Sequence, residues 1–332
     1  MNTKVNQKMT DAELSKKLGH YQKAARFWLL IGLIGVVSGT ISFFAVKDTL
    51  IKSILVTVLF FGGVCCAIFP GGGAQKKLKA LLQEQMGDFF KEEFEKAFGP
   101  EWQTPEMKID EPFMKRFGLF ENQWEECEVE NFHEGIHRSA HQGAHQGAHQ
   151  GAHQGIHFSV ANLRLNHVYE RSIPHEGWET CREELFRGLV LRLDTGISYP
   201  SPVCVHARIE ESPRGVRTGI LTGDDRFNKD FCVAAEEKEA RCLLTPEFIS
   251  WLRKTEETIE GKVKGFVWEG NTFSVAIETE YGFAGIAGNV DVSNLDAVRK
   301  SYINSLRSMG ETIDLFADSP VLPNAGSARG KE

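Results

Sequence analysis

Two long apolar stretches lie close together near the N-terminus of the chain. They cover residues 27–46 and 50–69, with Lys47 and Asp48 in the short turn between them. As helices that rise about 1.5 Å per residue, both are long enough to cross a hydrocarbon core about 30 Å thick. The pattern therefore predicts a transmembrane hairpin of two helices over residues 27–70. A cleaved signal peptide is the alternative for the first stretch, but no small-residue cleavage site follows it and a second apolar stretch comes at once.

The basic residues around the hairpin predict its orientation. Six Lys and Arg residues precede the first stretch, and Lys76, Lys77 and Lys79 follow the second. Because the cytoplasmic flanks of membrane helices are enriched in Lys and Arg, we expect a multi-pass protein with both termini in the cytoplasm. The outer loop then holds only a few residues, so binding or chemistry is expected on the cytoplasmic side.

Helices are predicted on both sides of the hairpin. In residues 1–26, Thr10 and Glu13 have the spacing of a capping box, which predicts a cytoplasmic helix that runs on into the membrane. A juxtamembrane amphipathic helix is predicted over residues 71–100. Its apolar stripe consists of Leu78, Leu82, Met86, Phe90, Phe94 and Phe98. This stripe needs a partner, which is either the soluble domain or another copy of the chain.

Gly35 and Gly39 form a small-residue step inside the first apolar stretch. Such a step lets a second helix approach closely, because no side chain stands between the two backbones. Two packings remain open: the hairpin packs on itself, or two copies meet in a homo-oligomer. The bilayer is in either case an expected partner of this part of the chain.

Beyond residue 100 the hydrophobic pattern changes to short runs that are typical of strands. The expected strands cover 127–132, 157–169, 185–193, 203–209 and 231–233. Residues 262–268 and 272–277 are expected to form a hairpin around the turn Glu269-Gly270-Asn271. Strands that follow one another without helical crossovers favour antiparallel pairing.

Two helices are expected among these strands. Thr245 and Pro246 form an N-cap followed by proline at the first helical position, which predicts a helix to about residue 259. Ser293 and Asp296 predict the start of another helix. We therefore expect a cytoplasmic α+β domain over residues 101–316, with mostly antiparallel strands plus helices, and a disordered tail over 317–332.

Charge and cysteine usage narrow the functional classes. The chain has a net charge of −7, and residues 1–79 hold eleven Lys and Arg against three Asp and Glu, so the remainder carries −15. An acidic domain argues against nucleic-acid binding, which depends on basic residues that neutralise phosphates. The seven cysteines form no CxxC pair, which fits a reducing compartment.

A histidine repeat interrupts the domain within an expected loop insert over residues 138–156. Four Ala-His-Gln-Gly copies there hold the candidate metal ligands His141, His145, His149 and His153. Imidazole binds Zn, Cu and Ni, but a Gly in every copy costs about 0.8–1.0 kcal/mol of helix propensity, and no carboxylate stands beside the histidines to orient them. The alternative is a passive loop expansion, because lengthening a loop costs little free energy.

The segment His133-Glu134-Gly135-Ile136-His137 matches the HExxH pattern of zinc proteases. That chemistry needs both histidines on one face of a helix, with the glutamate as general base. The residues before the motif alternate like a strand and a glycine lies within it. In a strand the two histidines lie about 13 Å apart, too far to share one metal ion.

With these residues in view, the region from about residue 75 to 316 resembles a bacterial membrane-anchored family known as "domain of unknown function 3137". The resembling stretches are Phe117-Gly118-Leu119-Phe120, Phe186-Arg187-Gly188-Leu189 and Ala240-Arg241-Cys242-Leu243-Leu244-Thr245-Pro246. The paired N-terminal spans also fit. The resemblance implies a protein of the inner (plasma) membrane of a bacterium with a cytoplasmic α+β domain. It brings no activity, cofactor or catalytic residue, and the histidine copies depart from the family pattern.

The leading hypothesis from the sequence is a protein without enzymatic activity that presents a cytoplasmic domain for interaction or scaffolding. It rests on the membrane tether, the amphipathic helix behind it and the lack of a catalytic motif. The expected partners are the bilayer and a protein of unknown identity, without nucleic acid or cofactor. The alternative is a metal-dependent enzyme or a metal-handling protein that uses the histidine-rich region.

Overall fold

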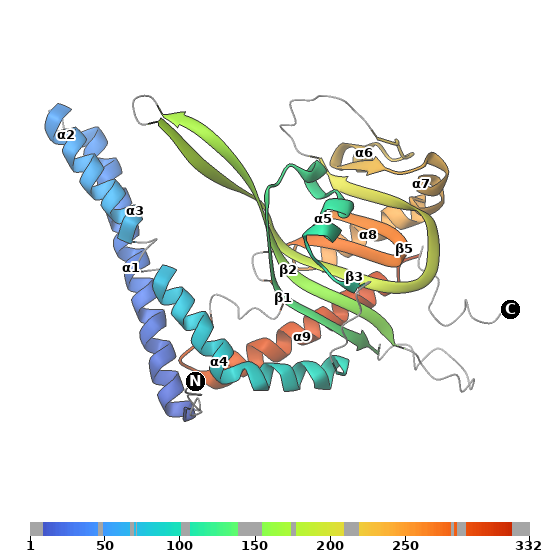
Figure 1. The fold of residues 1–332 in the computed structure, drawn as a ribbon, viewed down its shortest axis with the longest axis horizontal. Coiled ribbons are helices and arrows are strands. Elements are labelled where there is room, and N and C mark those ends of the chain that lie inside the picture. Colours follow the sequence, from blue (N-terminus) through green and yellow to red (C-terminus); the bar gives the residue numbers. More distant parts are fainter. Residues whose placement is uncertain are drawn as a thin grey trace, which may run out of the picture. The chain divides into compact units, whose positions relative to one another are not determined.

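The computed structural model forms two compact units (Figure 1). The described residues are 9–45, 49–66, 70, 72–100, 107–138, 155–173, 177–208, 219–279, 282–283 and 290–320. The first unit comprises Met1–Glu93 and Ile286–Tyr302, and the second comprises Phe94–Gly285 and Ile303–Glu332. Most of the expected tail lies outside the described residues.

The first unit begins with one long helix, α1 (Asp11–Ala45), which holds the expected cytoplasmic helix and the first apolar stretch without a break. By length and composition, its residues 11–44 suffice to cross a membrane. Apolar side chains along it stay open to the surroundings, with Leu33 61% and Phe44 81% exposed. Such an apolar surface is typical of a helix that faces lipid.

The second apolar stretch, expected as one helix over residues 50–69, consists of shorter pieces. These are α2 (Thr49–Val56), the π-helical η1 (Thr57–Phe61) and α3 (Gly62–Cys66). These pieces follow one another without a gap, and Val56 and Gly62 on either side of η1 have α-helical dihedral angles, so the chain stays helical from residue 49 to 66 with one π-helical turn. Residues 67–69 lie outside the described part.

Glycines bring α1 into close contact with the segments that follow it. A Cβ atom on Gly35 would lie 2.7 Å from the Cα of Gly63, and one on Gly39 would lie 3.0 Å from the Cβ of Phe60. Only glycine allows the backbones to approach so closely. The Gly35–Gly39 step therefore packs this part of the chain on itself.

The start of α1 forms a helical bundle with α4 (Gly72–Phe98) and the start of α9 (Leu295–Ala317). The expected capping box is present, because the Thr10 N–H donates to Glu13 Oε2 at 3.2 Å and the Glu13 N–H donates to Thr10 Oγ1 at 3.4 Å. The bundle core consists of Leu14, Leu18, Leu82, Met86, Val292, Leu295 and Val298. The part of the α4 apolar stripe that contains Leu82 and Met86 thus packs against α1 and α9 of the same chain.

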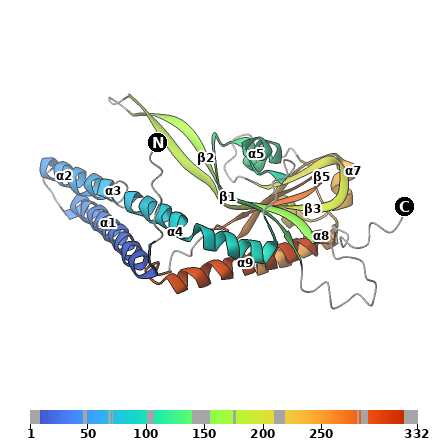
Figure 2. The same ribbon diagram turned by 60° about the horizontal axis from the view of Figure 1, so that its bottom comes forward.

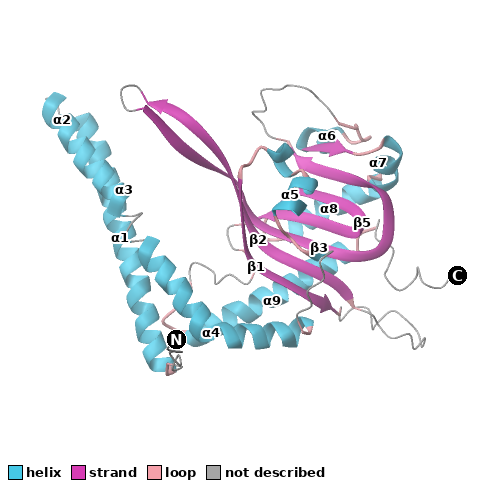
Figure 3. Ribbon diagram, in the orientation of Figure 1, coloured by secondary structure: helices cyan, strands magenta, loops and turns pink. Residues whose placement is uncertain are grey.

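The second unit is built on a five-stranded antiparallel sheet (Figure 3). Its strands are β1 (Glu126–His137), β2 (Ile156–Ile173), β3 (Gly177–Ala207), β4 (Phe231–Ala234) and β5 (Lys262–Glu278). The order is β1-β2-β3-β4, and β5 also pairs with β3. Antiparallel strands with helices confirm the expected α+β class.

Helices cover both faces of this sheet (Figure 2). They are α5 (Glu111–Phe117), η4 (Leu119–Asn122), α6 (Asp225–Asp230), α7 (Glu237–Leu243), α8 (Pro246–Thr258) and the end of α9. On the α5 face, Phe113 and Phe117 join a core with apolar residues of β2 and β3. On the opposite face, Phe248 of α8 lies 5.2 Å from the Trp268 ring of β5.

The expected hairpin around Glu269-Gly270-Asn271 is confirmed, because the two halves of β5 lie side by side. Lys264 Nζ lies 3.0 Å from Glu278 Oε2, and the Phe266 and Phe273 ring centroids are 6.3 Å apart. Both halves also pair with β3: Gly188 pairs with Glu278, and His206 pairs with Gly265. The two strands that we expected over 185–193 and 203–209 are correspondingly parts of the long β3. Gly270 in the turn has a φ of +60°, which glycine adopts without a steric penalty.

The helix starts agree largely with the sequence. Thr245 caps α8 as expected, because its hydroxyl accepts the N–H of Phe248 at 3.2 Å. At the start of α9, the capping acceptor is Asn294, whose side chain accepts the N–H of Ala297 at 3.1 Å. Ser293, the expected cap, instead hydrogen-bonds to Asp291.

Candidate interaction site on the sheet

The histidine copies cannot be placed. His141, His145, His149 and His153 all lie outside the described residues. Within the described ranges, no group of three or more His, Cys, Asp and Glu side chains could hold a metal ion. The metal candidates therefore stay a prediction from the sequence.

The HExxH segment lies in β1, as its alternation predicted, and not in a helix. His133 stacks on Phe94 at 4.7 Å between ring centroids, and His137 Nε2 lies 2.8 Å from Asp314 Oδ1. Glu134 is buried and pairs with Ser159, so it lies on the opposite face of the strand from both histidines. A general base on the wrong face excludes the zinc-protease arrangement for this segment.

A buried polar row crosses the sheet where the sequence showed no site. Glu134, Ser159, Arg192 and Ser274 stand opposite one another on β1, β2, β3 and β5, and each is at most 4% exposed. Arg192 donates to the Lys108 carbonyl at 3.0 Å, and burial lowers its pKa to about 10. The row fixes the segment before α5 onto the sheet.

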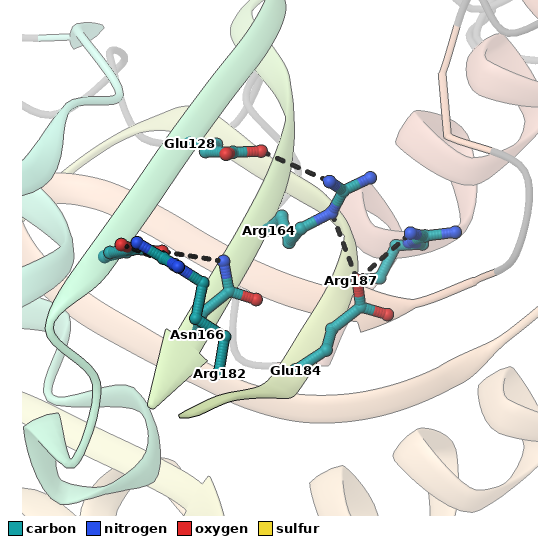
Figure 4. A network of polar contacts seen from close by, with 7 residues as sticks. Glu128, Arg164, Asn166, Arg182, Glu184 and Arg187 are labelled. Atoms are coloured by element: carbon teal, nitrogen blue, oxygen red, sulfur yellow. Dashed lines mark hydrogen bonds and ion pairs between the residues drawn. The ribbon is translucent and has the colours of Figure 1, made fainter. Parts of the chain in front are cut away.

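A second polar cluster lies on exposed parts of β1, β2 and β3 (Figure 4). Figure 4 shows Arg164 between two carboxylates, with its guanidinium 3.3 Å from Glu128 and 3.1 Å from Glu184. Arg187 also reaches Glu184, at 3.0 Å, and Arg182 reaches Glu126 at 2.9 Å. The carboxylates and guanidinium groups thus form a charged strip across three strands.

His167 of β2 and Glu125, which directly precedes β1, form a separate polar pair. Glu125 Oε2 accepts the backbone N–H of Val168 at 2.7 Å and lies 3.0 Å from His167 Nδ1. The hydrogen bond from Val168 lowers the pKa of the Glu125 carboxyl, with a smaller contribution from His167. Next to the start of β1, the backbone N–H of Val168 in β2 thus donates to a side-chain carboxylate instead of to a backbone carbonyl.

An open groove of about 880 Å³ adjoins the strip, between residues 184–187 of β3 and the two ends of β5. Its walls carry the carboxylates of Glu184, Glu260 and Glu278 and the cations of Arg187 and Lys262. The full lining comprises Glu184, Leu185, Phe186, Arg187, Glu260, Gly261, Lys262, Glu278 and Thr279. Alternating charges on an open surface suit a ligand that carries both signs, such as a peptide.

Two glycines, Gly261 in the groove and Gly188 next to it, allow close backbone contacts with β5. A Cβ atom on Gly188 would clash with the carbonyl oxygen of Ile277, so only glycine lets β5 come this close to β3. Gly261 has a φ of +142°, and a Cβ atom on it would lie 2.5 Å from the carbonyl oxygen of Glu278. Both close approaches place the backbone of β5 against the groove.

One edge of β3 is unpaired at this groove. β5 pairs with β3 from Gly188 onward, and the Thr279 N–H adds one bond to the Arg187 carbonyl at 3.1 Å. From Gly177 to Glu184, β3 pairs only with β2 among the strands that the structure describes. An unpaired edge offers backbone donors and acceptors to another extended chain.

Comparison with known proteins bears on the same region. Residues 184–316 match the family model described as "Protein of unknown function (DUF3137)". The match begins in β3 and ends in α9, and it includes every residue that lines the groove. The resembling stretches at 186–189 and 240–246 lie inside it, whereas the one at 117–120 lies before it.

No curated protein and no solved structure matches the chain. Two of the resembling residues inside the matched region have structural roles. Gly188 permits the close pairing of β3 with β5, and Thr245 caps α8. The groove, β4, β5 and the helices α6, α7 and α8 thus fall within the matched segment, whereas β1 and β2 lie before it. Residues 184–316 of this chain therefore form a DUF3137 domain.

Proposed function

We propose that this protein is a membrane-anchored module that binds an extended segment of another protein in the groove between β3 and β5. The apolar stretches of α1, α2, η1 and α3 anchor it as a multi-pass protein in the inner membrane of a bacterium. The basic residues that flank these stretches support a cytoplasmic location of both termini. The sheet domain then acts in the cytoplasm.

The unpaired edge of β3 carries this proposal. It continues the line of β5 directly, because Arg187 still accepts a bond from Thr279, whereas no described strand pairs with the preceding residues of β3 on that side. An extended peptide that enters the groove would continue the sheet antiparallel to β3. Backbone hydrogen bonds would supply affinity, and the side chains along the groove would supply specificity.

The charges of the groove define the partner. Glu184 is engaged with Arg164 and Arg187, and Glu278 is engaged with Lys264 at 3.0 Å. Glu260 and Lys262 line the groove and have no ion pair within the described part of the chain. A peptide with one basic and one acidic residue near each other would pair with both.

The proposal is tested by site-specific crosslinking in the full-length, membrane-bound protein. A photoreactive residue is placed at Lys262 in the groove and, as a matched control, at the exposed Lys238 on α7. We expect a light-dependent adduct with one protein at position 262 and not at 238. Equal labelling at both positions would contradict a specific groove.

The captured protein is then purified and titrated against the full-length chain. Exchanging the two charges in Glu260→Lys/Lys262→Glu keeps the net charge, and we expect it to weaken binding about tenfold, which corresponds to about 1.4 kcal/mol. The control exchange Lys238→Glu/Glu239→Lys should leave affinity unchanged. Hydrogen exchange should slow at the amides of residues 183–187. Unchanged exchange there, or turnover of the captured protein as a substrate, would refute strand addition as the function.

A further inference from the structure

The hairpin of β2 and β3 projects from the sheet as a two-stranded ribbon (Figure 1). β1 stops pairing with β2 at Asn166 and β5 stops pairing with β3 at Gly188, whereas β2 and β3 remain paired up to Ile173 and Gly177. At about 3.3 Å per residue, this ribbon extends about 20 Å beyond the other strands. Isolated two-stranded ribbons are marginally stable in water, so a surface that receives the ribbon would stabilise it.

The end of the ribbon presents an unsupported tryptophan. Trp178 is 74% exposed, the most exposed ring after that of Phe44 in α1 among the large hydrophobic residues that the structure describes. Its partner across the ribbon is Ser172, whose small side chain cannot cover the indole. Tyr169, 41% exposed, lies further back and stacks with His167 at 5.4 Å between ring centroids.

The charges near Trp178 nearly cancel. Glu170, Arg171 and Glu179 are exposed, and Arg171 pairs across the ribbon with Glu179. The described end of the ribbon therefore carries about one negative charge, so electrostatic attraction cannot be its main source of affinity for a surface.

We propose that Trp178 inserts into the interfacial layer of the lipid bilayer in which the chain is anchored. Tryptophan favours this layer, because its ring is apolar and its N–H can still bond to headgroups or water. The inference rests on the membrane anchor of the proposed function, which confines the ribbon near a bilayer and raises the effective concentration of lipid. It is otherwise independent of the groove.

A lipid surface fits the ribbon end better than a protein does. A protein interface of ordinary size buries about 800 Å² on each partner, with several apolar contacts around its centre. The described tip offers one large aromatic ring, flanked by Gly177, Ser172 and Thr180. One indole on a narrow ribbon can enter the headgroup region of a bilayer without a matching pocket.

The test uses the full-length chain in phosphatidylcholine nanodiscs, with and without bromine on the acyl chains, which quenches nearby tryptophan. The emission of Trp178 is the difference between the natural chain and Trp178→Phe. We expect brominated lipid to remove most of this difference emission, with no change in high salt. The control is Trp251→Phe on α8, where the Trp251 ring contacts Phe248 and Phe316. Its difference emission should be unaffected by brominated lipid.

A second reporter distinguishes a failure of this inference from a failure of the membrane anchor. Trp28 in α1 reports anchoring through the difference between the natural chain and Trp28→Phe. Quenching of Trp28 without quenching of Trp178 would overturn the inference and leave the anchor intact. Trp178 emission that is blue-shifted but unquenched would show that protein covers the ring, and it would also overturn the inference. Absence of quenching at Trp28 would overturn the anchor together with the inference.

Discussion

At the scale of single residues, the buried polar contacts in the described part of the chain stabilise the fold. Arg192 crosses the core between Lys108 and Thr272, with its guanidinium 4.3 Å from the centre of the Phe113 ring. Burial of a charged group costs free energy, which its hydrogen bonds and the ring partly offset. Nothing in the local sequence Leu191-Arg192-Leu193 distinguishes this residue from an exposed arginine on a strand, because only the pairing of distant strands buries it.

Asp224 provides a test of pH dependence at a single side chain. Its carboxylate accepts the Phe227 N–H at 2.8 Å, which caps α6, and it lies 2.6 Å from a nitrogen of Arg253. The hydrogen bond from Phe227 lowers the pKa of this carboxyl from 3.8, and Arg253 adds to the effect. A lowered folded-state pKa means that the stabilisation is complete above the unfolded value and is lost as pH falls through the folded value.

We expect Asp224→Asn to lower the free energy of unfolding by about 1 kcal/mol at neutral pH, since asparagine retains the cap but loses the charge. The difference from the natural chain should shrink to nothing as the carboxyl becomes protonated below pH 3.8. Denaturant unfolding at a series of pH values measures it, with Asp225→Asn in the same turn as control. A difference that persists in acid would show that the carboxylate charge has no role.

At the scale of elements, the pairing of β3 with the end of β5 depends on one glycine. We expect Gly188→Ala to destabilise the protein by about 3 kcal/mol, because the new methyl group would meet the Ile277 carbonyl and force the strands apart. Gly223→Ala is the control, since a Cβ atom there would have nothing within 4 Å, and it should change stability by less than about 0.5 kcal/mol. Thermal unfolding of both variants measures the difference. Equal melting temperatures would mean that the strands can separate at this point without cost.

The elements also show where sequence patterns reach their limit. Features whose cause lies within a few residues were predicted correctly. They are the capping box at Thr10, the cap at Thr245 and the strand around His133. The turn at Glu269-Gly270-Asn271 also has its cause in the local sequence, whereas the pairing of both halves of β5 with one long β3 joins distant residues and was missed. The groove arises from the same long-range pairing and has no local signature.

At the scale of the whole molecule, a late segment of the chain packs against its first helix. Residues 292–298 contact α1 and α4, which lie before and after the apolar stretches. The Ser15 hydroxyl donates to the carbonyl of Ser293, and Gln22 donates to the carbonyl of Val290 at 2.9 Å. Arg299 pairs with Asp11 at 2.9 Å. The sequence indicated that α4 needs a partner but not which segment supplies it, because the contact of α4 with α9 joins distant residues, such as Phe90 and Tyr302, which are 212 positions apart.

This long-range bundle predicts how the chain behaves when its N-terminus is removed. A variant that starts at Gly72 lacks Leu14 and Leu18, so Leu82, Met86 and Val298 lose their cover. Burial of each such side chain contributes about 1.5–3 kcal/mol, and we expect the variant to self-associate in detergent-free buffer.

A second variant keeps residues 9–26 and replaces 27–71 by a flexible linker of similar length, so the cover over α4 and α9 remains. We expect it to stay monomeric in sedimentation velocity and light scattering, since the exposed apolar surface of residues 27–66 has been removed. Adding Leu14→Asp and Leu18→Asp to it should restore self-association, because two carboxylates cannot be buried against Leu82 and Val298 without a large desolvation cost. A monomeric variant from Gly72 would show instead that α4 and α9 cover one another, and that the start of α1 serves only to enter the membrane.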